Sequence, residues 1–161
     1  MAVIITYLVI AIVLFVAAYL TKRRFGLLGL ALAAGSILSG IWAYDGGLVA
    51  SLFGFPTGPF TSAVISSVIV LLPASVLLFH GYTYKTMVGR IIGAFLFTVL
   101  ATAFLIEPLS HVLILQGFGS NVFQWLIDYK EALIGVGLVV AVIDLFFTKP
   151  VHLSGRHPKK R

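Results

Sequence analysis

Residues 3–44 read VIITYLVIAIVLFVAAYLTKRRFGLLGLALAAGSILSGIWAY, and this stretch decides the fold. It holds two apolar runs, residues 3–20 and 26–44, and a helix needs about 20 apolar residues to cross the hydrocarbon core of a bilayer. The short basic segment TKRR joins them. A connection this short predicts an antiparallel helical hairpin. We therefore expect a protein built from membrane-spanning helices.

The composition of the whole chain agrees with this prediction. The chain has 161 residues, of which 60% are hydrophobic and 10% are charged, and its mean hydropathy is +1.12. Soluble domains average about 45–50% apolar and about 25% charged residues. So few charged side chains cannot cover a soluble globule, which excludes a soluble enzyme, a disordered protein and a repeat solenoid. The chain has no cysteine, so disulfides and thiolate metal sites are excluded as well.

Three further apolar runs are expected to cross the membrane as helices: residues 61–80, 91–107 and 132–147. Pro73 lies in the middle of the first of these runs and should kink it. The last run belongs to a helical pattern that begins at Asn121, and about 28 residues of helix would be about 42 Å long. Because the hydrocarbon core is only about 30 Å thick, the first turns of this helix should lie outside it.

Residues 108–120 lie between the last two of these runs. Pro108 disfavours helical geometry at Glu107, so we expect the preceding helix to end there. The segment is short and contains proline and glycine, which favours a re-entrant or interfacial position over a sixth span. The sequence thus predicts an all-α polytopic membrane helix bundle of five spans over residues 1–148, followed by a basic cytoplasmic tail over 149–161.

The charged residues give this bundle a direction. If the N-terminus is outside, every lysine and arginine except Lys130 lies on the cytoplasmic side, and every acid except Asp144 lies outside or near the outer end. Loops rich in Lys and Arg stay on the cytoplasmic side. The pattern therefore predicts a multi-pass protein of the plasma (inner) membrane with its N-terminus out and its C-terminus in.

Basic residues at the inner end are also expected to contact anionic lipid headgroups, at about 1 kcal/mol for each residue near the surface. These residues are Lys22, Arg23, Arg24, Lys159, Lys160 and Arg161. The net charge of +6 is then an orientation signal combined with lipid contact. Nucleic acid is not an expected partner, because the basic tail is short and carries no interleaved aromatic residues.

Small residues at a spacing of four mark the second and fourth apolar runs. The residues expected to serve helix packing are Gly29, Ala31, Gly35, Ser39, Gly40, Gly89 and Gly93. Packing is the main attraction between helices in lipid, and small residues let two backbones approach closely. Two interpretations stay open at this point: contacts within the chain, or a face that binds a second copy or another membrane subunit.

Three ionisable residues are candidates for a polar or transport site: Glu107, His111 and Asp144. Glu107 and His111 are four apart and would share one helix face, where a carboxylate and an imidazole could relay protons or bind a cation. Two ligands alone make a poor metal site. The alternative is that all three are interfacial, with Asp144 paired to Arg90 or Lys149.

The first hairpin resembles the colicin V production protein (CvpA) family. The resemblance rests on the turn Arg23-Arg24-Phe25-Gly26, the small-residue second helix, the segment Arg90-Ile91-Ile92-Gly93-Ala94 and the stretch Pro108-Leu109-Ser110. It covers the layout of residues 1–125. Members of that family are small bacterial inner-membrane proteins linked to toxin export and envelope maintenance. This chain departs from them in having no acid in its first span and an additional span at the end, and no site residue carries over.

The chain carries none of the common catalytic patterns. It has no His-Glu-x-x-His, no phosphate-binding loop and no nucleophile elbow, and we expect no cofactor. The sequence predicts a membrane protein without enzymatic chemistry, a scaffold or accessory subunit of a membrane assembly or of an export or envelope-maintenance system. Its expected partners are the bilayer and further copies or other membrane subunits. The alternative is the protomer of a small oligomeric transporter or channel that uses Glu107, His111 and Asp144.

Overall fold

The protein is described here by a computed structural model. The residues it describes are 2–42, 51, 54, 56, 58–79, 83–84, 86–110 and 118–146. This part of the chain is helical: α1 (Ala2–Thr21), α2 (Phe25–Trp42), α4 (Pro59–Phe79), α5 (Met87–Ser110) and α6 (Phe118–Phe146). Among these residues the β-type pairing is a single isolated bridge between Arg23 and Thr83. The predicted all-α class is therefore confirmed. The predicted tail, 149–161, lies outside the described residues.

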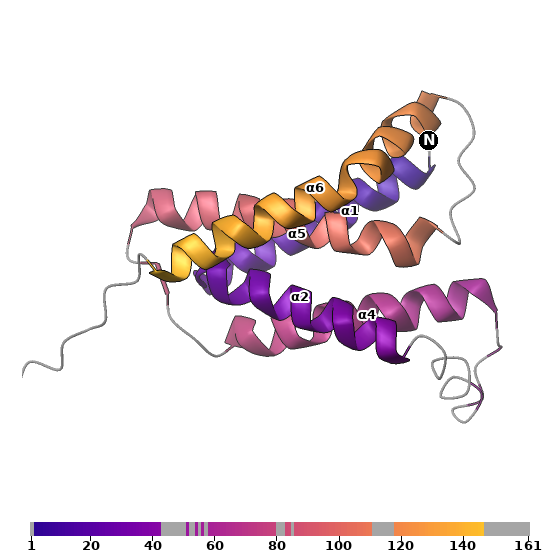
Figure 1. The fold of residues 1–161 in the computed structure, drawn as a ribbon, viewed down its shortest axis with the longest axis horizontal. Helices are drawn as coiled ribbons and strands as arrows, with labels where there is room; N and C mark the ends of the chain where they lie inside the picture. Colours follow the sequence, from indigo (N-terminus) through magenta and orange to yellow (C-terminus); the bar gives the residue numbers. More distant parts are fainter. Residues whose placement is uncertain are drawn as a thin grey trace, which may run out of the picture.

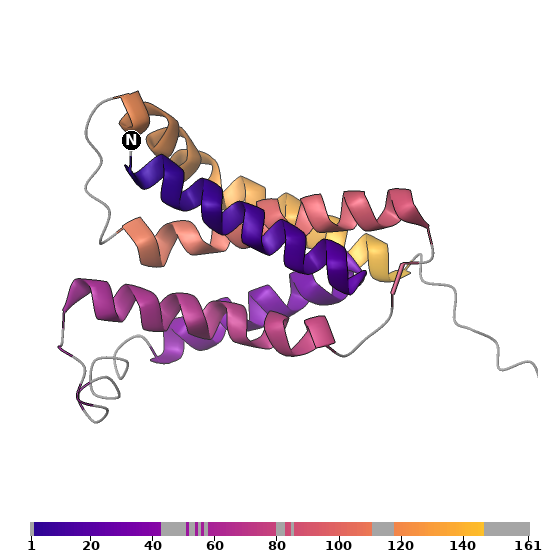
Figure 2. The same ribbon diagram turned by 180° about the vertical axis from the view of Figure 1, so that it is seen from behind.

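The helices form two groups that meet at one end of the molecule. Helix α2 packs most extensively along α4, and α1 packs along α5. Helix α6 crosses over both α2 and α5 (Figure 1). At the left-hand end of Figure 1 the C-terminal ends of α1, α4 and α6 lie beside the N-terminal ends of α2 and α5. Towards the other end the α2–α4 pair diverges from α1, α5 and α6, as the reverse view in Figure 2 also shows.

Three of the helices, α2, α4 and α5, are long and apolar enough to cross a membrane. Helix α1 contributes a shorter apolar stretch, Ile5–Thr21. Helix α6 has 29 residues, which makes it about 43 Å long at a rise of about 1.5 Å per residue. Its first half carries Asp128, Lys130 and Glu131, whereas its second half is apolar up to Asp144. These lengths support the prediction of a membrane protein.

The expected helix end at Glu107 is wrong, because α5 continues through Pro108 to Ser110. A proline in the last turn removes only one intrahelical bond, the one that its missing N–H would donate to the carbonyl of Phe104. The hydroxyl of Ser110 donates to the carbonyl of Glu107 at 2.7 Å, which satisfies one acceptor that the helix end leaves open. The local preference at the residue before a proline is therefore overridden.

The predicted interfacial segment is shortened from both sides as a result. Residues 108–110 belong to α5 and residues 118–120 to α6, so the last helix begins earlier than Asn121. Residues 111–117 lie outside the described part of the chain. Pro73 lies inside α4, which remains helical on both sides of it.

Helices α2 and α5 supply most of the core. Leu28 and Leu32 of α2 and Phe97, Leu100 and Ala101 of α5 are at most 1% exposed. The periphery is apolar as well: the large outward-facing side chains include Ile12, Val68, Phe95 and Val139, each more than half exposed. A soluble protein would cover such surfaces with polar groups, whereas lipid chains solvate them directly.

Candidate functional site

Arginines fasten helix ends to one another where the two helix groups meet. Arg23, in the turn between α1 and α2, donates from Nε to the carbonyl of Leu78 at 2.9 Å and from a terminal nitrogen to that of Phe79. Arg90 of α5 donates to the carbonyl of Tyr19 at 3.2 Å and lies 4.7 Å from the centre of its ring. The accepting carbonyls lie in the last turns of α4 and α1, where backbone acceptors lack partners and positive charge is favoured.

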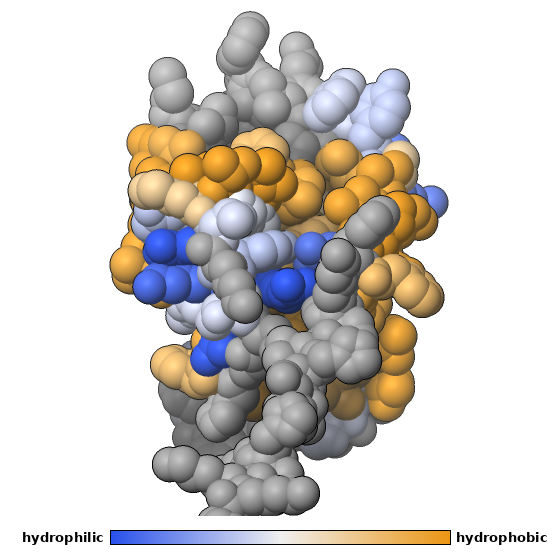
Figure 3. All heavy atoms as spheres, turned by 90° about the vertical axis from the view of Figure 1, so that its left-hand side faces the viewer, coloured by the Kyte–Doolittle hydropathy of each residue, from blue (hydrophilic) through white to orange (hydrophobic). Residues whose placement is uncertain are grey.

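The turn between α1 and α2 is also hydrogen-bonded to the segment that precedes α5. Lys22 takes a left-handed conformation, with φ of 58°, which is typical of the residue that follows a helix. Its N–H donates to the carbonyl of Ala18 at 3.2 Å, and its own carbonyl accepts from the N–H of Tyr84 at 2.8 Å. This turn is thereby joined to the segment that precedes α5. Figure 3 looks onto this end and shows hydrophilic side chains in a patch across it, bordered by hydrophobic surface.

Not all of the predicted headgroup-binding residues are equally free to meet lipid. Lys22 is exposed, whereas Arg23 and Arg24 are half-buried. Arg23 binds the end of α4, and the Arg24 guanidinium lies 5.7 Å from the centre of the Tyr84 ring. The other three, Lys159, Lys160 and Arg161, lie outside the described residues. Within the described part, Lys22 is therefore the most available of these side chains.

Asp144 lies near the end of α6 and contacts the beginning of α2. Its Oδ2 accepts a hydrogen bond from the backbone N–H of Gly26 at 2.9 Å. This N–H belongs to the first turn of α2, where donors have no partner within the helix and a negative charge is favoured. Asp144 therefore caps α2 from another helix. The sequence singled out this acid, with Arg90 or Lys149 as its partner in one of two interpretations; Lys149 lies outside the described residues.

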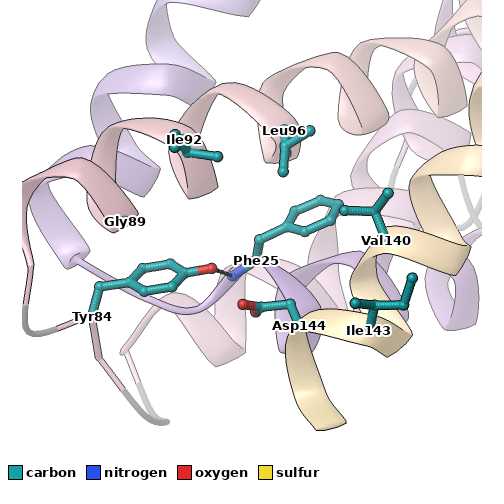
Figure 4. A pocket seen from close by; sticks show the side chains of 8 residues that line it. All are labelled: Phe25, Tyr84, Gly89, Ile92, Leu96, Val140, Ile143 and Asp144. Atoms are coloured by element: carbon teal, nitrogen blue, oxygen red, sulfur yellow. Dashed lines mark hydrogen bonds between the residues drawn. The ribbon is translucent and has the colours of Figure 1, made fainter. Parts of the chain in front are cut away.

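Tyr84 completes this cluster, and it is not among the site residues predicted from the sequence. Its hydroxyl oxygen accepts from the N–H of Phe25 at 3.2 Å (Figure 4), so a second orphan donor at the start of α2 is satisfied. Burial raises the pKa of Tyr84 from 10.0 to about 12, and the negative charge of Asp144 adds to the shift. The phenol therefore stays protonated at neutral pH.

Gly89 and Gly93 make room for the ring of Tyr84. A Cβ on Gly93 would lie 2.5 Å from Cε2 of Tyr84, and one on Gly89 would lie 3.0 Å from Cδ1. The sequence predicted that this pair of glycines brings two helices together. The structure differs, because the space that their missing side chains leave is filled by an aromatic side chain from the preceding loop.

A cavity of about 300 Å³ opens beside this cluster, between α5 and α6. Figure 4 shows that apolar side chains form most of its wall and that Tyr84 and Asp144 lie on one side of it. Both of these polar groups already bind the start of α2. This arrangement, which we call the tyrosine cluster (Phe25, Gly26, Tyr84 and Asp144), stabilises a helix end.

Four of the predicted packing residues on α2 lie at contacts within the chain. A Cβ on Gly35 would overlap the backbone carbonyl of Val70 in α4, and one on Gly29 would lie 2.9 Å from Cβ of Ala141 in α6. Ala31 is buried, and the hydroxyl of Ser39 donates to the carbonyl of Ser66 at 3.4 Å. Gly40 differs from these, because it is exposed and a Cβ there would meet nothing within 4 Å.

Glu107 lies at the opposite end of the bundle from Asp144. Its Oε2 is 3.4 Å from Nζ of Lys130 in α6, and the Glu107 side chain is 73% exposed. It borders a second cavity of about 240 Å³ between α2, α4 and α5, which we call the serine cavity. Its wall includes Ser36, Ser39, Ser66, Phe104, Glu107 and Pro108. His111, the predicted companion of Glu107, lies outside the described residues.

The two candidate acids therefore do not form one site. Lys130, the partner of Glu107, and Asp144 are both on α6, and the 14 positions between them correspond to about 21 Å of helix. Within the described ranges, no group of three or more His, Asp or Glu side chains could hold a metal ion. No protein-family model matches the sequence, and comparisons with curated proteins and with solved structures give no match. The resemblance to the CvpA family stays a prediction.

Proposed function

We propose that α1, α2, α4, α5 and α6 all cross the plasma (inner) membrane, with the N-terminus outside and the C-terminus inside. The distribution of charge along the bundle supports this proposal. Lys22, Arg23, Arg24 and Arg90 lie at the end where the helix termini are fastened together, whereas Lys130 lies towards the other end. Basic residues favour the cytoplasmic side. A reporter fused to the C-terminus tests the orientation, and an external C-terminus would overturn it.

The function that we propose is that of a membrane scaffold or accessory subunit without enzymatic chemistry. This proposal is supported by the hydrogen bonds that the charged side chains make to helix ends. Arg23 and Arg90 cap the ends of α4 and α1, and Asp144 caps the start of α2. Groups that carry out transport or catalysis face a cavity or a path through the membrane. Here Asp144 borders a cavity, but it and the two arginines bind backbone groups at helix ends and so hold the helices in fixed positions, as a scaffold requires.

The alternative, a transporter or channel protomer that uses Glu107, His111 and Asp144, has less support. Glu107 and Asp144 lie near opposite ends of the bundle, and buried apolar side chains such as Phe97 and Leu100 occupy the core between the helices. A relay between the two acids would need polar groups or water along that distance. Reconstitution into liposomes separates the two functions. We expect no proton or cation flux, whereas a flux abolished by Glu107→Gln or Asp144→Asn would favour the transporter.

The partners that we propose are further copies of the chain or other membrane subunits, and the resemblance to the CvpA family suggests an export or envelope-maintenance system. The outward faces of the helices carry many exposed apolar side chains, so partner helices and lipid compete for the same surface. Extraction in a mild detergent, followed by mass measurement and identification of co-purified proteins, tests this proposal. A larger species is expected. A monodisperse monomer with no co-purified subunit would contradict it.

A further inference from the structure

The serine cavity has a composition that the scaffold proposal does not explain. It is lined by residues of α2, α4 and α5, and its volume is about 240 Å³. Pockets for drug-sized ligands are usually about 300–1,000 Å³, so this one suits a smaller group. Four of the eight residues in its wall, Ser36, Ser39, Ser66 and Glu107, have polar side chains.

Every polar side chain in this wall can accept a hydrogen bond, and none of them carries a positive charge. Ser36, Ser39 and Ser66 contribute hydroxyl groups, and Glu107 contributes a carboxylate. Pro108 has no N–H, so the carbonyl of Phe104, another residue of the wall, lacks its helical donor. The wall therefore favours a ligand that brings several N–H donors and a positive charge.

The positively charged side chain of Lys130 lies beside the cavity, next to Glu107. Nζ of Lys130 is 3.4 Å from the carboxylate of Glu107, so a positive and a negative charge flank the opening together. On the same helix, Trp125 and Tyr129 lie with their rings 4.9 Å apart, and both are about half exposed. Tryptophan and tyrosine are enriched at the level of lipid headgroups. This end of the bundle thus has the chemistry of a membrane interface.

We propose that the serine cavity binds the headgroup of a zwitterionic phospholipid that carries a primary ammonium. The ammonium group donates to Glu107 and to the serine hydroxyls, and the phosphate lies against Lys130. An anionic headgroup without an ammonium would bring a second negative charge beside the Glu107 carboxylate and no N–H donor for it. A quaternary ammonium would bring charge but no N–H donor for the exposed acceptors. The site goes beyond the scaffold function, since it would exist in a scaffold and in a transporter alike.

Native mass spectrometry of the full chain with a series of lipids tests the proposal. The lipids share their acyl chains and differ only in the headgroup: phosphatidylethanolamine, its N-methyl and N,N-dimethyl derivatives, and phosphatidylcholine. Each methyl group removes one N–H donor, so affinity should fall along the series. Because hydrogen bonds to charged groups are worth about 1.5–3 kcal/mol, the first and last members should differ by about tenfold or more.

Two variants and a matched control assign the binding to this cavity. Glu107→Gln should reduce the preference for phosphatidylethanolamine by about tenfold. Ser36→Ala leaves the ion pair between Glu107 and Lys130 intact, so it tests the cavity without changing the charges, and should reduce the preference about threefold. Glu131→Gln makes the same chemical change at an exposed acid next to Lys130, and it should leave binding unchanged. Circular dichroism must show that all three variants remain helical.

Four results would overturn the proposal. Equal binding of phosphatidylethanolamine and phosphatidylcholine would remove the need for N–H donors. Tighter binding of phosphatidylglycerol than of either would place the lipid at the basic end of the bundle. Unchanged binding in both Glu107→Gln and Ser36→Ala would place it elsewhere on the surface. Displacement of the lipid by free phosphoethanolamine at equal concentration would identify the ligand as a water-soluble molecule.

Discussion

Removing the carboxylate of Asp144 should loosen α2 from α6, and the size of the effect follows from the contact. Asp144 accepts from the N–H of Gly26 at 2.9 Å, and a hydrogen bond to a charged group contributes about 1.5–3 kcal/mol. We therefore expect Asp144→Ala to lower the free energy of unfolding by about 1.5–3 kcal/mol. In Asp144→Asn the amide oxygen can still accept, and only the charge at the helix end is lost, so the loss should be about 1 kcal/mol or less.

Reversible unfolding in mixed micelles, followed by far-ultraviolet circular dichroism, measures these changes. Asp128→Ala is the matched control, since Asp128 is an exposed acid on the same helix, and it should change the free energy of unfolding by less than about 0.5 kcal/mol. The order of stability should be wild type, then Asp144→Asn, then Asp144→Ala. If Asp144→Ala were as stable as Asp128→Ala, the hydrogen bond from Gly26 to Asp144 would contribute nothing to stability, and the proposed cap of α2 would be refuted.

Three further predictions concern the helix contacts and the buried phenol. Gly35→Ala should lower the free energy of unfolding by about 1–3 kcal/mol because the new Cβ overlaps the Val70 carbonyl, whereas Gly40→Ala, on an open face, should not lower it in the same micelle assay. Gly93→Ala should displace Tyr84, and a fall in the fluorescence or near-ultraviolet dichroism of that ring, absent in the Gly40 variant, would report it. The absorbance of ionised Tyr84 should emerge near pH 12, not pH 10. Because its folded-state pKa is raised, Tyr84 supports folding below pH 10 and this support is lost between pH 10 and 12. A Tyr84→Phe variant whose stability falls equally across that window would refute the assignment.

The helices could be predicted from the sequence because apolar length and composition alone determine them. Residues 3–20 and 26–44, for example, become α1 and α2 with ends within a few positions of those expected. The end of α5 could not be predicted in the same way. The rule for Glu107 before Pro108 describes a local preference, and near a helix end the loss of one hydrogen bond is small enough for packing to override it.

The tyrosine cluster was harder to predict because its members are far apart in the sequence. Gly26 and Asp144 are separated by 118 positions, and no local pattern joins them. The sequence nevertheless contains one indication of this contact, which is that no capping side chain precedes α2. Helix α2 begins after Arg24, which is not a side chain that caps a helix N-terminus, so the first N–H groups of α2 needed acceptors from elsewhere. An uncapped helix start together with a lone acid in an apolar run would have suggested this pairing.

The two ends of the bundle differ in how they are held, and this difference connects the fold to the lipid proposal. At the basic end, Arg23, Arg90, Tyr84 and Asp144 link all five described helices by hydrogen bonds to backbone groups. At the other end, the polar contacts between helices include an exposed ion pair between α5 and α6 and a long hydrogen bond between α2 and α4. Neither of these contacts joins the two helix groups.

A headgroup in the serine cavity would link the two groups at this end, since the cavity wall includes residues of both. The ion pair between Glu107 and Lys130 joins α5 to α6, and an exposed pair contributes only about 0–1 kcal/mol. A lipid that binds only the folded state stabilises it by about 2.7 kcal/mol at a hundredfold excess over its dissociation constant. Stability in micelles should therefore rise with added phosphatidylethanolamine, and Ser36→Ala should weaken that rise while leaving stability without lipid nearly unchanged. A rise that is the same in both proteins would mean that the lipid stabilises the bundle from another surface.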